Sequence, residues 1–224
     1  MNWLQIRLFG PYFSSFSTNS YGYYSQTSQN LVSNIQIFAS ALIARQAARG
    51  TIMALLRIRH YPEPVLKKVA TPVTEFDDSL RQLAHDMAET MYAAPGIGLA
   101  APQVGISKRL AIIDCSARDG ESQLLFLVNP EIIDREGDCC EEEGCLSVPE
   151  YYAKVERSAK VKVRFQNLDE QTHVIEVEGL MAVACQHEID HLDGILFVDH
   201  LSPLKRSLFR KKWKKIQEHM TEQM

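Results

Sequence analysis

The sequence predicts an α+β fold, with antiparallel β-sheets packed around one central helix and a further helix at the C-terminus. Apolar residues alternate with charged ones at Val161-Lys162-Val163-Arg164-Phe165, which is typical of a half-buried strand in an antiparallel sheet. The predicted strands precede one late helix, which begins near Leu180 and stops before Gly194. This order indicates α+β rather than alternating βαβ units.

The first 52 residues differ in composition from the rest of the chain. They contain no Asp, Glu or Lys, only three arginines, many serines and a cluster of aromatic residues. This composition resembles an organellar transit peptide. A poorly ordered tail, or translated upstream sequence before a start at Met53, would look the same, and we favour the start at Met53. We therefore expect a disordered leader (1–52), a main domain (53–202) and a basic C-terminal helix (203–224).

Length and composition limit the function classes. At 224 residues and 46% hydrophobic, the chain can bury one core, and no stretch approaches the roughly 20 apolar residues that cross a membrane. A net charge of −4 argues against a general DNA or RNA binder. Five irregularly spaced cysteines predict reduced thiols. A structural zinc site from Cys139, Cys140 and Cys145 is an alternative, although C-x-x-C spacing is missing.

A helix and four strands are predicted before the late helix. Asp77 or Asp78 can cap the first helix, whose apolar residues recur at helical spacing until Pro95. Turn residues at Gly120 and at 167–169 separate strand candidates. These strands are expected at 110–114, 124–128, 161–165 and 174–177.

The run from Gly96 to Gln103 consists of small and apolar residues that end in a single amide. Such residues let the backbone lie close to another chain or to a ligand, and Gln103 is the side chain there that can donate a hydrogen bond. The run lacks the Lys-Ser/Thr pair of a phosphate-binding loop.

The stretch His187-Glu188-Ile189-Asp190-His191 carries the strongest chemical signal. Two histidines four apart on a helix project from one face, so both can reach one metal ion while Glu188 flanks it. A buried helix with hydrogen-bonded histidines is the alternative, but it would bury Glu188 without a cation. A third ligand is required, and Phe197 cannot supply it at the position where related zinc sites have a histidine. Cys145, which follows a glycine, would complete a His2Cys set with one position open for water.

The C-terminal segment is strongly basic. Its apolar residues give a partly amphipathic helical pattern. A solvated helix that covers the domain is slightly favoured over one that docks on an anionic surface such as RNA. The basic residues are Lys205, Arg206, Arg210, Lys211, Lys212, Lys214 and Lys215, and the apolar ones are Leu204, Leu208, Phe209, Trp213 and Ile216.

Three motifs, 96–103, 143–147 and 186–191, occur in the order of the signature motifs of peptide deformylases, which the chain resembles from Met53 onward. The resemblance implies removal of the formyl group from the initiator methionine of nascent chains. It implies metal ligands Cys145, His187 and His191 around ferrous iron, Fe²⁺, with Zn²⁺ or Ni²⁺ as substitutes. It also implies Glu188 as general base and acid, with Gln103 and the backbone N–H of Leu146 as oxyanion donors.

The resemblance further implies that the substrate lies as an added strand along Gly96–Gly98. The methionine side chain is expected in an apolar pocket of Ile97, Leu180, Val183 and Ala184, with Gly98 and Arg157 also near the substrate. Expected partners are N-formylmethionyl nascent peptides and, through the basic helix, the ribosome surface, with no membrane and no DNA. The expected compartment is the bacterial cytoplasm, or an organelle if residues 1–52 are a transit peptide.

Two other functions use the same residues. The first is a zinc endopeptidase that cleaves internal peptide bonds with the H-E-x-x-H motif. The second is a binding module without activity that the basic helix recruits to the ribosome. The complete set of ligands together with Glu188 and Gln103 argues against the second. Substitution of Cys145 discriminates the first, because a protease with another third ligand would keep its metal.

Overall fold

One antiparallel sheet organises the residues that the structure, a computed structural model, describes, 55–116 and 122–222. Its five strands follow chain order, and each pairs with the next. The α+β class is confirmed, although the described strands form a single sheet. The leader and Gly120 lie outside the described residues. The strands are β1 (Gly98–Ala100), β2 (Leu110–Ile113), β3 (Leu125–Cys145), β4 (Val148–Gln166) and β5 (Thr172–Glu178).

Strands β3 and β4 are much longer than the sequence predicted. The predicted strands at 124–128 and 161–165 cover only the ends that lie in the core. Beyond them the two strands continue as a hairpin that closes at Cys145 and Val148. Most of β3 after residue 133 is exposed, so its residues show no alternation of apolar and polar side chains. Backbone pairing with the neighbouring strand, rather than burial, holds this part of the hairpin.

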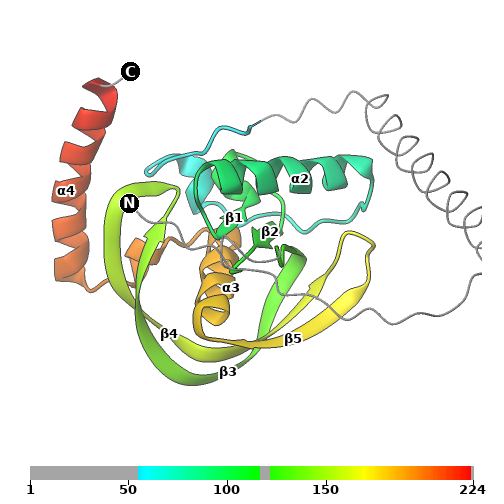
Figure 1. Cartoon of the computed structure of the whole chain (residues 1–224). Helices are drawn as coiled ribbons and strands as arrows, with labels where there is room; N and C mark the ends of the chain where they lie inside the picture. The colour runs from blue at the N-terminus through cyan, green and yellow to red at the C-terminus, as the bar shows by residue number, and fades with distance from the viewer. Residues whose placement is uncertain (1–54, 117–121, 223–224) are drawn as a thin grey trace, which may run out of the picture. The chain divides into compact units, whose positions relative to one another are not determined.

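Helix α3 (Gly179–Leu192) is the central helix, and β3, β4 and β5 curve around it in Figure 1. Its buried face packs on the inner side of the sheet, where Val161, Val163 and Phe165 point. The predicted stop is also present, because Gly194 has a left-handed φ of 72°. A Cβ at this glycine would lie 2.8 Å from the backbone carbonyl of Lys67, so no larger residue fits there.

Helix α2 (Asp78–Ala93) covers β1 and β2 with a second apolar cluster. The predicted cap is confirmed, since the Asp77 carboxylate accepts a hydrogen bond of 2.9 Å from the Leu80 N–H. Three short 3₁₀ helices complete the connections in the part of the chain that the structure describes. They are η1 (Pro64–Lys67), η2 (Ala101–Val104) and η3 (Phe197–His200).

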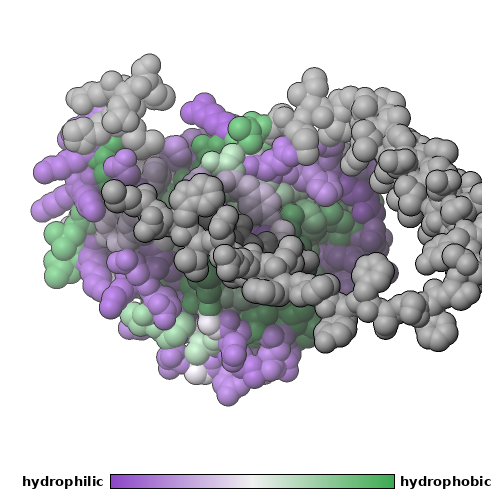
Figure 2. Space-filling model, viewed as in Figure 1, coloured by the Kyte–Doolittle hydropathy of each residue, from purple (hydrophilic) through white to green (hydrophobic). Residues whose placement is uncertain are grey.

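Helix α4 (Pro203–Glu222) confirms the predicted C-terminal helix and covers the domain with one face. Phe209, Trp213 and Ile216 are buried, and the Phe209 ring centroid lies 4.8 Å from that of Tyr151. Burial of such side chains contributes roughly 1.5–3 kcal/mol each. Leu204 and the neighbouring Leu208, which were expected on the apolar face, are instead exposed. The edge of the molecule where α4 lies is largely hydrophilic in Figure 2.

Candidate metal and catalytic site

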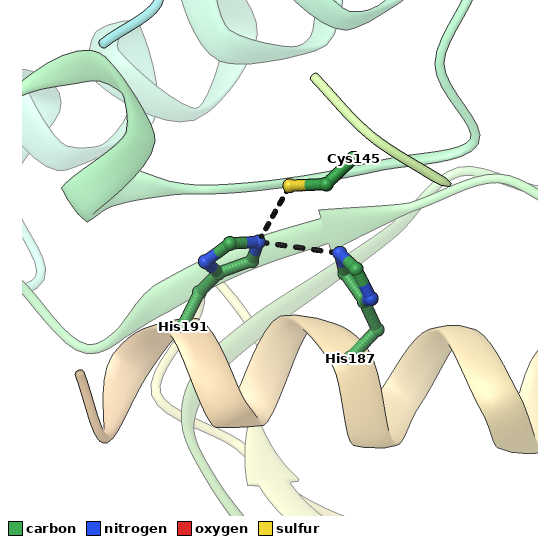
Figure 3. A group of neighbouring side chains, drawn as sticks. All are labelled: Cys145, His187 and His191. Atoms are coloured by element: carbon green, nitrogen blue, oxygen red, sulfur yellow. Dashed lines mark hydrogen bonds between the residues drawn. The ribbon is translucent and has the colours of Figure 1, made fainter. Parts of the chain in front are cut away.

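The two motif histidines and Cys145 converge at the closed end of the β3–β4 hairpin. His187 and His191 rise from one face of α3, and Cys145 points down on them from the last residue of β3 (Figure 3). The Cys145 Sγ lies 3.2 Å from His191 Nε2, which lies 3.2 Å from His187 Nε2. The three possible ligand atoms all lie within 4.8 Å of one another. This spacing lets one ion contact all three atoms.

The chemistry of these donors fits a divalent metal ion. The Glu143 carboxylate accepts a hydrogen bond of 2.8 Å from His187 Nδ1, which leaves Nε2 as the atom that faces His191 and Cys145. Although burial opposes it, hydrogen bonds to Cys145 and Glu143 raise the pKa of His187 well above its ordinary value. A proton and a metal ion therefore compete for Nε2. A thiolate with two imidazoles suits zinc or iron.

Cys139 and Cys140 do not join this cluster. They are adjacent in β3, opposite Arg157 and Glu156 of β4. Among the described residues, the group of possible metal ligands is Cys145 with the two histidines. The alternative of a structural zinc site at Cys139, Cys140 and Cys145 thus has no support in the geometry.

Glu188 lies beside the cluster as a buried carboxyl group. It is 4% exposed, and its Oε2 has no hydrogen-bond partner among the described residues. Burial raises the pKa of Glu188 to about 7. Gly98 gives it room, because a Cβ there would lie 2.3 Å from Glu188 Oε1. A carboxyl group with this pKa can accept and donate a proton near neutral pH.

Gln103 is held with its amide aimed at the cluster. Its Oε1 accepts a hydrogen bond of 2.7 Å from the Ala100 N–H, so the amide cannot rotate freely. Its Nε2 donates to Ser147 Oγ at 3.2 Å and lies 3.5 Å from Cys145 Sγ. The amide N–H is therefore preorganised next to the possible ligands.

A cavity of about 520 Å³ opens over these groups. The residues that line it include Gln103, Cys145, His187 and Glu188 at the polar end. The residues predicted for substrate binding also line it, with the exception of Arg157. At the apolar side these are Ile97, Gly98, Leu180, Val183 and Ala184, and Leu146, a predicted oxyanion donor, also lines the cavity. Ile97 and Leu180 are partly exposed at its mouth, whereas Val183 and Ala184 are buried.

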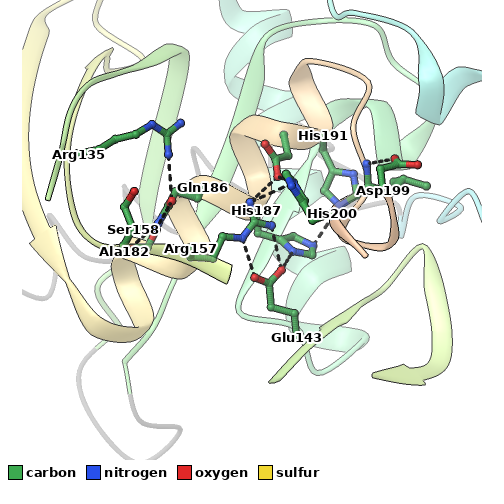
Figure 4. A network of polar contacts seen from close by, with 12 residues as sticks. Arg135, Glu143, Arg157, Ser158, Ala182, Gln186, His187, His191, Asp199 and His200 are labelled. Carbon is green, nitrogen blue, oxygen red and sulfur yellow. Dashed lines mark hydrogen bonds and ion pairs between the residues drawn. The ribbon is translucent and has the colours of Figure 1, made fainter. Parts of the chain in front are cut away.

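Arg157, which was predicted near the substrate, is not among the residues that line the cavity, and in Figure 4 it lies beside Glu143 and His187. It is 7% exposed, and its Nε donates to Glu143 Oε1 at 2.7 Å and its Nη2 to Glu143 Oε2 at 3.0 Å. Its Nη1 donates to Asp190 Oδ2 at 2.5 Å. The buried carboxylate of Glu143 and the partly buried one of Asp190 thus use its donors, which directs the guanidinium away from the cavity.

Sequence reasoning assigned no role to Glu143, although it precedes Gly144 in the cysteine motif. Burial opposes ionisation of Glu143, but hydrogen bonds from His187 and Arg157 outweigh it and lower its pKa to about 2. Glu143 is therefore a carboxylate that fixes the orientation of His187. Its neighbour Glu142 is exposed, because successive side chains of β3 point to opposite faces of the sheet. The pleat of the strand is therefore the only feature that distinguishes the two acids.

Gln186, the residue before the first motif histidine, fixes α3 against β4. Its Nε2 donates to the Ser158 and Ala182 carbonyls, each at 2.9 Å. Its Oε1 accepts from the Ser158 N–H and from Arg135 Nη1, each at 3.0 Å. This buried amide makes the four hydrogen bonds available to it. These bonds fix the position of His187 and His191 along β4.

A family model described as polypeptide deformylase matches residues 55–207. The chain belongs to the peptide deformylase family. The peptide deformylase of Desulfotalea psychrophila is 52% identical over 164 residues, which are 73% of this chain and 97% of that protein. That of Alkalilimnicola ehrlichii is 53% identical over 164 residues, which are 73% of this chain and 92% of that protein.

Solved structures of peptide deformylases share the fold. The crystal structure of the enzyme from Legionella pneumophila has 46% identity and a TM-score of 0.71, and the match covers 75% of this chain and 98% of that one. The enzyme from Acinetobacter baumannii, solved with Met-Ala-Ser bound, has 38% identity and a TM-score of 0.64 over 67% of this chain and 100% of that one. Membership of this deformylase family disfavours the endopeptidase alternative.

The described part of this deformylase shows no helix with the length and apolar character needed to cross a membrane. In α4, the longest one there, the buried residues among 203–218 all lie on the side that packs against the domain.

Proposed function

We propose that this deformylase removes the formyl group from N-formylmethionyl peptides and releases formate. The observation that carries the proposal is the meeting of Cys145, His187 and His191 with Glu188 and Gln103 at the polar end of one cavity. Family membership supports the same reaction.

Cys145, His187 and His191 would hold a divalent metal ion, which supplies Lewis-acid polarisation of the formyl carbonyl and of a water molecule. Glu188 accepts a proton from the attacking water and gives it to the methionine nitrogen as the C–N bond breaks. Its pKa of about 7 suits both transfers at neutral pH.

The oxyanion that develops on the formyl oxygen needs donors that are already in place. The Gln103 Nε2 is one, because its orientation is set by the bond from Ala100 to its carbonyl oxygen. The backbone N–H of Leu146 is the other proposed donor. Leu146 lies in the tight turn between β3 and β4, next to Cys145 and in the cavity lining.

The substrate is proposed to lie as an added strand beside β1. This strand is at one end of the sheet order, with β2 on its inner side, so its outer edge can pair with a peptide. The methionine side chain would then enter the apolar pocket past Ile97 and Leu180 to the buried Val183 and Ala184. The bound Met-Ala-Ser in the Acinetobacter baumannii enzyme supports a peptide ligand in this family.

Ferrous iron is the proposed metal, with Zn²⁺ or Ni²⁺ as substitutes. The donor set accepts all three ions. Iron with a thiolate ligand is sensitive to oxygen, so the iron form should lose activity in air while Cys145 becomes oxidised. An iron form with unchanged activity and iron content after long aerobic storage would contradict iron as the metal at this site.

The ribosome surface is the proposed docking partner of α4. Phe209, Trp213 and Ile216 face the domain, which leaves the basic side chains of α4, such as Lys211 and Lys215, exposed on the other side. An exposed basic helix is attracted to the phosphates of RNA. We place the enzyme in the bacterial cytoplasm, or in an organelle if residues 1–52 are a transit peptide. Truncation before Pro203 should abolish ribosome association, and unchanged association would exclude this role.

The decisive experiment measures formate release from a formyl-Met-Ala-Ser peptide by protein loaded with iron, zinc or nickel. A matched peptide with an acetyl group and an internal amide tests the endopeptidase alternative. We expect formate from the first peptide and no cleavage of the second. The reverse outcome would overturn the proposed function.

A further inference from the structure

We infer that His200 is a positioning residue for the metal centre. It is the last residue of η3, outside the three sequence motifs, and its side chain is 35% exposed. Its Nε2 lies 2.6 Å from Asp190 Oδ2. A carboxylate only accepts hydrogen bonds, so the imidazole Nε2 is the donor. The inference rests on the proposed metal site and names a residue that acts on it from outside.

A continuous path of hydrogen bonds joins His200 to a metal ligand. Asp190 Oδ2 also accepts from Arg157 Nη1 at 2.5 Å. The same guanidinium donates to both oxygens of Glu143, at 2.7 and 3.0 Å. Glu143 Oε2 in turn accepts from His187 Nδ1 at 2.8 Å. Four contacts therefore separate the exposed imidazole from the ligand imidazole.

The Arg157 guanidinium passes a displacement at Asp190 on to Glu143, because it is planar and rigid. Its donors form a fixed fork, so a change at the Asp190 side of Arg157 moves the side that holds Glu143. Arg157 and Glu143 are each 4% exposed in their side chains, whereas Asp190 is 18% exposed. Asp190 is thus the place where water can enter the path.

His200 blocks the access of water to Asp190. Its ring donates to the same oxygen of Asp190 that binds Arg157, and it lies 3.4 Å from Arg157 Nη1. Two carboxylates share one guanidinium in this group, which leaves an excess of negative charge that a further donor stabilises. Without the imidazole, water would compete for Asp190, and Arg157 would hold Glu143 less firmly. His187 would then lose part of its fixed orientation.

The test measures how fast Co²⁺ or Zn²⁺ leaves the folded protein in the presence of a chelator. His200→Ala removes the donor, and His200→Asn places its amide too close to the backbone to reach Asp190. His200→Gln puts an N–H near the position of Nε2. We expect the first two variants to lose metal about 3–10-fold faster than the wild type, because His200 lies further from the ligand than the partners whose loss costs about 10–100-fold. The glutamine variant should stay within about 2-fold of the wild type.

The matched control is His173→Ala. His173 is an exposed histidine of β5 that stacks on Phe165. This control should retain the wild-type rate of metal loss. The visible spectrum of the Co²⁺ form provides a second measurement, because a reoriented His187 changes the ligand field in the alanine and asparagine variants alone.

Wild-type rates in the alanine and asparagine variants would overturn the inference. So would a glutamine variant as impaired as the alanine variant, because that result means that the hydrogen bond to Asp190 is not what matters. The metal-loss assay needs no substrate. If wild-type protein released no formate, the proposed function would fail, and the role of His200 would still be decided by the rates.

Discussion

Replacement of Gly98 by alanine tests the close approach of β1 to Glu188. The added Cβ would lie 2.3 Å from Glu188 Oε1 and 2.9 Å from Cδ, whereas contacts under 3.0 Å essentially never occur. The carboxyl group must therefore move by about 0.7 Å or more. A displacement of about 1 Å at a reacting group costs on the order of 10²-fold in rate. We expect kcat/KM for formate release to fall by about that factor.

The fold should survive this substitution. Gly98 lies in a β-strand and is not one of the glycines with positive φ, so alanine adopts its backbone conformation without strain. Metal content should also be retained, because Glu188 is not a ligand in the proposed site.

Gly137→Ala is the matched control. Gly137 lies in the exposed part of β3 with φ 63°, where alanine costs roughly 1 kcal/mol of stability but touches no catalytic group. This control should be less stable and fully active. A Gly98→Ala enzyme with activity within about 3-fold of wild type would refute the argument from Glu188 position.

Three further predictions concern the residues of the site. Cys145→Ala should lose its metal in dialysis against a chelator, as measured by metal analysis, and full retention would favour a different third ligand. Glu188→Ala should keep its metal but lower formate release by about 10²–10⁴-fold, and near-normal turnover would remove its assigned role. The folded-state pKa of Glu143 is about 2, below its ordinary value of 4.5, so its carboxylate stabilises the fold above about pH 4.5. This contribution, on the order of 3 kcal/mol, should disappear as the pH falls toward 2, and unfolding of Glu143→Gln should lack that part of the acid dependence.

Local patterns predicted the helices well, because their signals lie within a few residues. The Asp77 cap contacts a backbone N–H three residues away, and the glycine stop after α3 depends on a single φ angle. The long hairpin was underestimated for the opposite reason. Its outer part is exposed on both sides, so no alternation marks it, and only pairing with β4 defines it.

The contacts of Arg157 could not be predicted from the sequence. Resemblance placed it near the substrate, but its guanidinium binds Glu143 and Asp190, which lie 14 and 33 residues away in the chain. Nothing in the spacing of these residues predicts that they meet. The same holds for His200, which reaches Asp190 only because η3 returns alongside α3.

The sequence by itself determined the reactive helix, since a separation of four residues places His187 and His191 on one face whatever surrounds them. It also supplied Cys145 as the candidate sulfur. The tertiary structure alone decided that this sulfur meets the imidazoles, that Gly98 leaves space for Glu188, and that Glu143 and Arg157 fix the orientation of His187. These contacts join strands and helices far apart in the chain, and their geometry follows from how the sheet curves around α3.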